Sequence, residues 1–258
     1  MNLERIFGFR ESADEPKPLL DHLEDLRGTI IRIAAAIGIG MLISFTFRTW
    51  LAAIVQQPLA NVAPDRAANL QSLGVADSFT ISLELAFYSG FVLAFPAVLF
   101  FLAEFVLPAL TPKEKKILFP AAFAGFFLFM IGVLFCYFVV LPQTLAFFFH
   151  DARSMNWQPT WTVREYYSFT TQFVIAFGLA FQLPLAVLVL VKAGVLDLAT
   201  LQRTRAFALV VIFVIAAIIT PTSDILTLAL MGGPMYLLYE LCIVIARILE
   251  ARDRHRND

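Results

Sequence analysis

The stretch Leu85–Ala103, LAFYSGFVLAFPAVLFFLA, contains no charged residue and decides the fold. A helix that crosses the hydrocarbon core of a bilayer needs about 20 mostly apolar residues, and this stretch has that length. Similar runs recur along the chain, so we expect an all-α, polytopic membrane protein with a single domain over residues 1–258. The six predicted spans lie at about 29–47, 79–107, 117–141, 166–191, 206–219 and 225–246.

The overall composition also indicates a membrane protein. Hydrophobic residues make up 60% and charged residues 15% of the chain, whereas soluble domains carry roughly 25% charged residues. A net charge of −1 gives no reason to expect a nucleic-acid partner. The two cysteines, Cys136 and Cys242, lie inside separate apolar runs, so we interpret them as small buried hydrophobes. The charged N-terminal stretch has no apolar signal-peptide core, so we expect no cleavage there.

The distribution of basic residues predicts the orientation. Of the 19 Lys and Arg residues, 15 lie in the termini and in the second-to-third and fourth-to-fifth connections. The other side holds the remaining four, Arg48, Arg66, Arg153 and Arg164. Because basic residues concentrate in cytoplasmic loops, we expect both termini in the cytoplasm. The connections 48–78 and 143–165 would then form an extracytoplasmic cap.

The last two predicted spans look short. From Arg205 to Pro221 there are about 15 helical residues, or roughly 22–24 Å at 1.5 Å per residue, which is less than the hydrocarbon core. The sixth span is interrupted by Gly232-Gly233-Pro234, and Pro142 would end the third. We therefore expect a concave wall of helices with a locally thinned bilayer around the last two.

Catalytic motifs such as HExxH, GxSxG or a phosphate-binding loop do not occur in the sequence, so we expect neither an enzyme nor a cofactor. Gln182 and Glu240 lie inside apolar runs, and Asp224 lies near the outer end of the sixth. Ionisable groups at membrane depth usually have a function, whereas a glutamine can simply bond a neighbouring helix. A small-molecule or ion transporter with Gln182 and Glu240 along its path is therefore an alternative.

Two polar clusters contain acids, one just before the first predicted span and one in the connection between the second and third spans. In LLDHLEDLR, residues 19–27, leucines form an apolar stripe while Glu24 and Asp25 fall on the other face. One interpretation is an interfacial helix start, with acids near the positive end of the helix dipole and a Glu24–Arg27 pair. In TPKE, residues 111–114, a T-x-x-E capping box accounts for Thr111 and Glu114. Glu114 would also be a carboxylate held at the cytoplasmic surface.

Six motifs in order along the chain resemble the TatC family, the large subunit of the twin-arginine protein translocase. They are HLEDLR (22–27), FVLPALTPKEKK (105–116), GVLFCYFVVLP (132–142), FGLAFQLP (177–184), ITPTSD (219–224) and GPMYLLYE (233–240). The resemblance implies a signal-peptide receptor and translocation core in the cytoplasmic (inner) membrane, which exports folded proteins with the proton-motive force. It implies partners of the TatA and TatB types, twin-arginine signal peptides, membrane lipid and a homo-oligomer within the receptor complex.

The resemblance also assigns roles to residues. Asp25, or Glu24 beside it, and Glu114 would bind the arginine pair, with Arg27 and Lys113 in the same site. The family-matching positions outside it are His22, Pro58 and Tyr137; for Pro58 and Tyr137 a purely structural role is the alternative. The outer turn with Thr220, Pro221 and Asp224 would set the depth of the last two helices and dock a partner helix. Glu240 would contact a partner span or bond within the fold.

The chain departs from the family pattern at three positions. Asp25 stands where relatives often have Glu, which leaves open whether Asp25 or Glu24 reaches the peptide. Thr29 replaces a second basic residue, and Gln182 replaces an intramembrane Glu. An amide does not titrate, so Gln182 cannot carry a proton.

Overall fold

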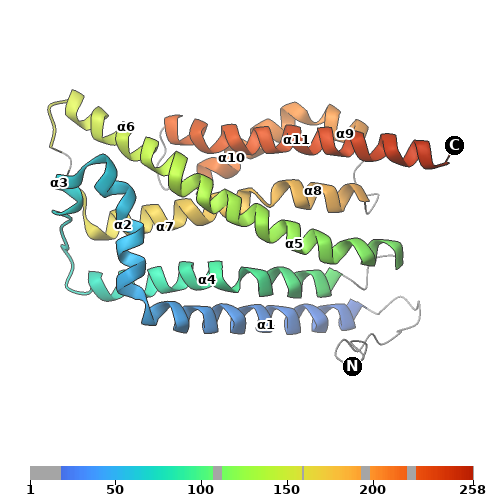
Figure 1. Ribbon diagram of the computed structural model, residues 1–258, viewed down its shortest axis with the longest axis horizontal. Coiled ribbons are helices and arrows are strands. Elements are labelled where there is room, and N and C mark those ends of the chain that lie inside the picture. The colour runs from blue at the N-terminus through green and yellow to red at the C-terminus, as the bar shows by residue number, and fades with distance from the viewer. Residues whose placement is uncertain (1–18, 107–111, 159, 193–197, 220–224, 258) are drawn as a thin grey trace.

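The computed structural model describes residues 19–106, 112–158, 160–192, 198–219 and 225–257, and in these ranges the chain is almost entirely helical (Figure 1). The parallel bridge Gln71–Thr162 is the one β-type pairing within them. The elements are α1 (Leu19–Thr46), α2 (Arg48–Val62), α3 (Pro64–Ala67), α4 (Asp77–Val106), α5 (Pro112–Phe135), the π-helical turn η3 (Cys136–Val140), α6 (Leu141–Ser154), α7 (Val163–Ala180), α8 (Leu183–Lys192), α9 (Leu198–Arg203), α10 (Arg205–Ile219) and α11 (Ile225–Asn257).

Five helical stretches of the described chain are long and apolar enough to cross a bilayer. They are Leu23–Thr46, Asp77–Phe105, Pro120–Ser154, Val163–Val191 and Thr227–Ile248. The all-α membrane fold predicted from the apolar runs is therefore confirmed. The predicted fifth span corresponds to a shorter apolar helix, Arg205–Ala217, so a total of six passes stays a prediction.

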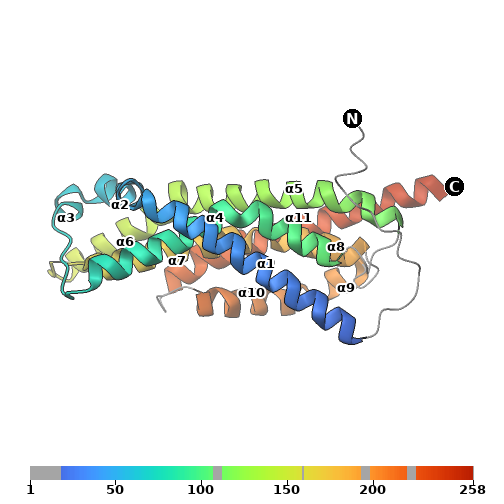
Figure 2. The ribbon, with the colours of Figure 1, turned by 90° about the horizontal axis from the view of Figure 1, so that it is seen from below.

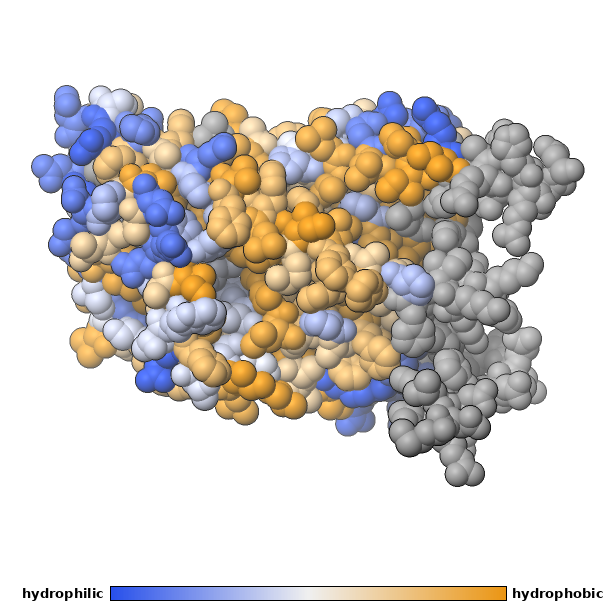
Figure 3. All heavy atoms as spheres, viewed as in Figure 1, coloured by the Kyte–Doolittle hydropathy of each residue, from blue (hydrophilic) through white to orange (hydrophobic). Residues whose placement is uncertain are grey.

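The helices run side by side along the long axis of the molecule (Figure 1). One end holds the start of α1, the end of α4, the start of α5 and the end of α11. The other end holds α2, α3, the end of α6 and the start of α7. Apolar side chains cover the middle of the face seen in Figure 3, and hydrophilic ones gather at the α2–α3 end. We call the end of the molecule where α1 starts the α1 end, and the end that holds α2 and α3 the α2 end. Which of the two faces the cytoplasm stays a prediction.

Pro142 does not end the third apolar helix, contrary to the prediction. The helix continues from α5 through η3 into α6 as far as Ser154. Pro142 lies directly after the π-helical turn, in which the Leu141 N–H bonds back five residues to the Cys136 carbonyl. The π-helical turn thus absorbs the proline without a break.

The predicted interruption of the last span is also wrong. α11 continues through Pro234, and Thr227–Ile248 is 22 residues long, enough to span. The reason for Gly232 is packing, because a Cβ there would lie 2.9 Å from Cε1 of Phe213 on α10. Only α10, with 15 residues, remains short. The expected thinning of the bilayer is therefore a prediction for α10 alone.

The core is built from aromatic rings and close helix crossings. Phe129 of α5 stacks on Phe95 of α4, with ring centroids 3.7 Å apart. A Cβ at Gly132 of α5 would lie 2.8 Å from the Phe177 carbonyl of α7, so glycine allows these helices to touch. Both predicted buried cysteines are confirmed as buried and free.

Candidate functional site

The predicted acids of α1 lie on its first turns and are exposed. Glu24, Asp25 and Arg27 all face outward, while Thr29 is buried with 3% of its surface exposed. The Thr29 hydroxyl donates to the Asp25 carbonyl at 2.9 Å. Thr29 is therefore a buried side chain that bonds its own helix. The side chain of His22 lies outside the described residues.

The second predicted acid belongs to the first turn of α5. Pro112 is the first residue of α5, where a proline costs no helical hydrogen bond, and Lys113 and Glu114 follow it. The side chains of these residues and the whole of Thr111 lie outside the described parts, so the predicted capping box stays a prediction. A carboxylate in this turn lies close to the positive end of the helix dipole. The starts of α1 and α5 share the α1 end (Figure 1).

An ion pair that the sequence reasoning missed joins α1 to α4 at this end. The Arg32 guanidinium donates to Glu104 Oε2 at 2.7 Å, and its carbon lies 5.6 Å from the centre of the Phe101 ring. Both charged side chains are about half exposed, at 47% and 51%. A sequence signal existed, since Arg32 lies near the start of the first apolar run and Glu104 near the end of the second, where consecutive antiparallel helices come together.

Gln182 lies at a break between α7 and α8, where Pro184 follows in the first turn of α8. Its Nε2 donates to the Gly125 carbonyl of α5 at 2.9 Å, and its Oε1 is buried without a hydrogen-bond partner among the described residues. A Cβ at Gly125 would come within 3.2 Å of this Oε1. Gln182 thus ties the break in the fourth apolar stretch to α5, as an amide at membrane depth can.

Glu240 is paired within the fold. Its carboxylate accepts from the Tyr236 hydroxyl at 3.0 Å and lies 3.1 Å from Arg205 at the start of α10. The neighbouring Tyr239 hydroxyl donates to the Leu201 carbonyl of α9 at 2.8 Å. Arg205 is a partner that the sequence reasoning missed. Gln182 and Glu240 therefore make their bonds to different helices, α5 and α10.

Tyr137 and Pro58 are linked at the α2 end through the backbone carbonyl of Ile54. Pro58 lies inside α2 and has no N–H for the carbonyl of Ile54, four residues earlier. The Tyr137 hydroxyl, from η3, donates to that carbonyl at 2.7 Å. Two neighbours on α7, Tyr166 and Tyr167, donate to the α2 carbonyls of Val55 at 2.7 Å and Ala52 at 3.1 Å. The sequence reasoning missed the α7 tyrosines.

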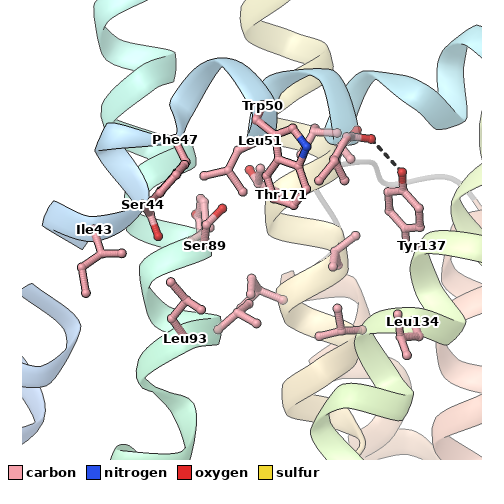
Figure 4. A pocket seen from close by; sticks show the side chains of 18 of the residues that line it. Ile43, Ser44, Phe47, Trp50, Leu51, Ser89, Leu93, Leu134, Tyr137 and Thr171 are labelled. Carbon is pink, nitrogen blue, oxygen red and sulfur yellow. Dashed lines mark hydrogen bonds between the residues drawn. The ribbon is translucent and has the colours of Figure 1, made fainter. Parts of the chain in front are cut away.

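A groove of about 670 Å³ lies beneath α2 (Figure 4). Its walls are mostly apolar side chains of α1, α2, α4, α5, η3 and α7, among them Ile43, Leu51, Leu93, Leu134 and Val174. Tyr137 stands at one side of it, bonded to α2 as the dashed line in Figure 4 marks. This hollow agrees with the predicted concave fold.

The remaining predicted residues, Thr220, Pro221 and Asp224, lie outside the described ranges. Within those ranges, no group of three or more His, Cys, Asp or Glu side chains is arranged to hold a metal ion.

Comparison with known proteins gives the family. The model of the family "Sec-independent protein translocase protein (TatC)" matches residues 21–234. TatC of Deinococcus radiodurans is 34% identical over 90% of this chain and 86% of its own length. TatC of Akkermansia muciniphila is 43% identical over 70% of this chain but only 52% of its own length.

A solved structure agrees with these sequence relatives. The crystal structure of the twin arginine translocase receptor TatC in DDM superposes with a TM-score of 0.80 at 35% identity, covering 87% of this chain and 99% of that chain. TatC of Aquifex aeolicus is 35% identical over 90% of this chain and 95% of its own. The family model, the Deinococcus relative and the superposed receptor each match most of the chain, and the chain therefore belongs to the TatC family of Sec-independent protein translocase proteins.

Proposed function

We propose that this chain is the receptor and core subunit of a twin-arginine translocase, which exports folded proteins across the cytoplasmic (inner) membrane using the proton-motive force. The receptor site is the α1 end. The observation that carries the proposal is a pair of exposed acids, Glu24 and Asp25, on the first turns of α1. They lie at the same end of the molecule as the first turn of α5, which contains Glu114 (Figure 1).

The chemistry of this end suits an arginine pair. A guanidinium is always charged and offers a planar fork of donors that matches a carboxylate, whereas a lysine ammonium is a point charge. Carboxylates on two different helices provide separate places for two arginines. Glu114 and one of the α1 acids would each bind one guanidinium, so the site would prefer twin arginines over twin lysines.

The topology and the partners belong to the same proposal. The chain would cross the membrane six times with both termini in the cytoplasm, which brings the α1 end to the side where signal peptides are made. Single-span proteins of the TatA and TatB types would dock near α10 and α11 on the extracytoplasmic side of the same membrane, beside the turn with Thr220, Pro221 and Asp224. A homo-oligomer of this subunit would form the receptor complex.

Peptide binding to the full chain in lipid nanodiscs tests the proposal. We expect a labelled twin-arginine signal peptide to bind the unchanged chain, and Asp25→Ala or Glu114→Ala to abolish binding while membrane insertion stays normal. Glu24→Ala shows which α1 acid makes the contact. The matched control is Asp65→Ala, which removes an exposed acid of α3 at the α2 end. Undiminished binding by both Asp25→Ala and Glu114→Ala would refute the assignment.

A further inference from the structure

The helix α1 depends on α4 for its direction. Large apolar residues of α1 are exposed, for example Ile30 and Ile31 at 57% each and Leu42 at 73%, so much of its surface has no protein neighbour. Figure 2 shows α1 at an angle to α4, on the side of the molecule that faces the viewer. Whatever fixes α1 against α4 therefore also fixes where the acids on its first turns lie.

The first fixed point is the crossing itself. A Cβ at Gly40 would clash with the Gly90 carbonyl oxygen, and a Cβ at Gly90 would clash with the Met41 backbone nitrogen. The two backbones are in direct contact here, and no larger side chain fits without a shift. This is the closest approach of two helices that pack against each other over much of their length, and the contacts nearest the start of α1 decide where its first turns lie.

The second fixed point is the contact of Arg32 with α4. The guanidinium bonds Glu104, lies over the Phe101 ring and has its Nε 3.4 Å from the Gly28 carbonyl. Glu104 and Phe101 are one helical turn apart on α4, as Arg32 and Gly28 are on α1, so the contact spans a turn of each helix. Because both charges are about half exposed, the pair contributes little to the stability of the fold. Its role would be to hold this part of α1 in place against α4.

The lengths involved show why the angle matters. At 1.5 Å per residue, Asp25 lies about 22 Å along α1 from Gly40, and Arg32 lies about 12 Å from it. A rotation of about 10° around the crossing would move Asp25 by roughly 4 Å on that lever. The donor–acceptor distance of a hydrogen bond varies by only a few tenths of an ångström. A shift of this size would therefore change the spacing between the α1 acids and the first turn of α5 by more than a hydrogen bond tolerates.

We infer that Arg32 and Glu104 are positioning residues of the receptor, which hold α1 at the angle that presents its acids for two arginines. The inference rests on the proposed function. Neither residue needs to touch the peptide, because Glu104 already accepts from Arg32 at 2.7 Å. Loosening the pair should lower the preference for twin arginine, since the site could no longer match the spacing of two guanidinium groups.

The test compares twin-arginine and twin-lysine peptides on the full chain in nanodiscs. Arg32→Ala and Glu104→Ala should each weaken twin-arginine binding by roughly 5- to 10-fold, with twin-lysine binding nearly unchanged, so that the preference falls. The swapped double variant, Arg32→Glu with Glu104→Arg, should regain twin-arginine binding to within about twofold of the original. Arg164→Ala is the control, because Arg164 faces Asp77 at 3.9 Å at the α2 end.

Each outcome decides the matter. Unchanged twin-arginine binding in both single variants would overturn the inference, and so would a swapped variant as weak as the singles, since that indicates direct peptide contact by Glu104. Equal losses for both peptides, together with a lowered unfolding temperature, would also overturn it in favour of a purely structural pair. If the unchanged chain bound no twin-arginine peptide, the proposed function would fail, and the inference with it.

Discussion

The two ends of the molecule handle their polar groups in opposite ways. At the α2 end, the hydroxyls of Tyr137, Tyr166 and Tyr167 all donate to carbonyls of α2, so the helix is bonded from beneath. At the α1 end, Glu24, Asp25 and Arg27 are exposed on the first turns of α1, and a half-exposed ion pair joins that helix to α4. At the α2 end the tyrosine hydroxyls are used inside the fold, whereas at the α1 end charged side chains are exposed on the surface.

The largest effect should come from reversing a charge at the α1 end. We expect Glu114→Lys to weaken twin-arginine binding by at least about 100-fold, because placing like charges together costs several kcal/mol. Peptide titration at two salt concentrations is the measurement, and insertion into the membrane should be unaffected. The same reversal at the α2 end, Asp65→Lys, serves as the control. Comparable losses from both variants would mean that the two ends do not differ as described.

The next effect concerns the crossing of α1 and α4. Gly90→Ala places a methyl group against the Met41 backbone nitrogen, so the helices must move apart, at a cost of about 1–3 kcal/mol. We expect both a lower unfolding temperature and weaker twin-arginine binding. Gly38→Ala is the matched control, because no atom lies within 4 Å of the position its methyl group would take. Normal peptide binding by Gly90→Ala would show that the angle of α1 does not matter.

The α2 end offers a test of its internal bonding. Tyr137→Phe should destabilise the protein by about 1–3 kcal/mol, because the Ile54 carbonyl loses its donor. In a Pro58→Ala background the helix regains its own N–H for that carbonyl, so the same change should cost less than about 1 kcal/mol. Thermal unfolding of the unchanged chain, the two single variants and the double variant in nanodiscs gives the coupling. Additive effects would contradict the link between Pro58 and Tyr137.

The smallest effect is expected at Glu240. Glu240→Gln should lower stability by less than about 1 kcal/mol, because Arg205 and Glu240 are 44% and 29% exposed and an amide can still accept from Tyr236. Unfolding temperature measures this loss. Unchanged stability combined with failed assembly with single-span partners would instead make Glu240 a partner contact.

The membrane fold was predictable because it depends on runs of apolar residues, which are local. Leu85–Ala103 lies wholly inside the apolar helix Asp77–Phe105. The effect of prolines was not predictable in this way. Pro142 is accommodated by a π-helical turn and Pro234 lies within a continuous helix, so the outcome depended on neighbouring turns rather than on the residue itself.

The site was predictable in part for the same reason. The exposure of Glu24 and Asp25 was expected from their charge, but Leu23 and Leu26 of the predicted apolar stripe are exposed as well, so the stripe does not pack against this chain. The pairing of Arg32 with Glu104 joins residues 72 positions apart, and that of Arg205 with Glu240 also joins two helices, so both need the tertiary fold. Pro58 in an apolar helix leaves the Ile54 carbonyl in need of a hydroxyl or amide donor. The sequence therefore indicates that a donor is required, but it does not indicate that Tyr137 supplies it.

Site-specific photocrosslinking tests the central claim most directly. A twin-arginine signal peptide with the photoreactive group beside the arginine pair is added to the full chain in membranes, and the crosslinked residues are mapped. The account predicts crosslinks within residues 19–27 and 111–116, and their loss in Glu114→Ala. Crosslinks that avoid both segments, or that persist undiminished in Glu114→Ala and Asp25→Ala, would contradict it.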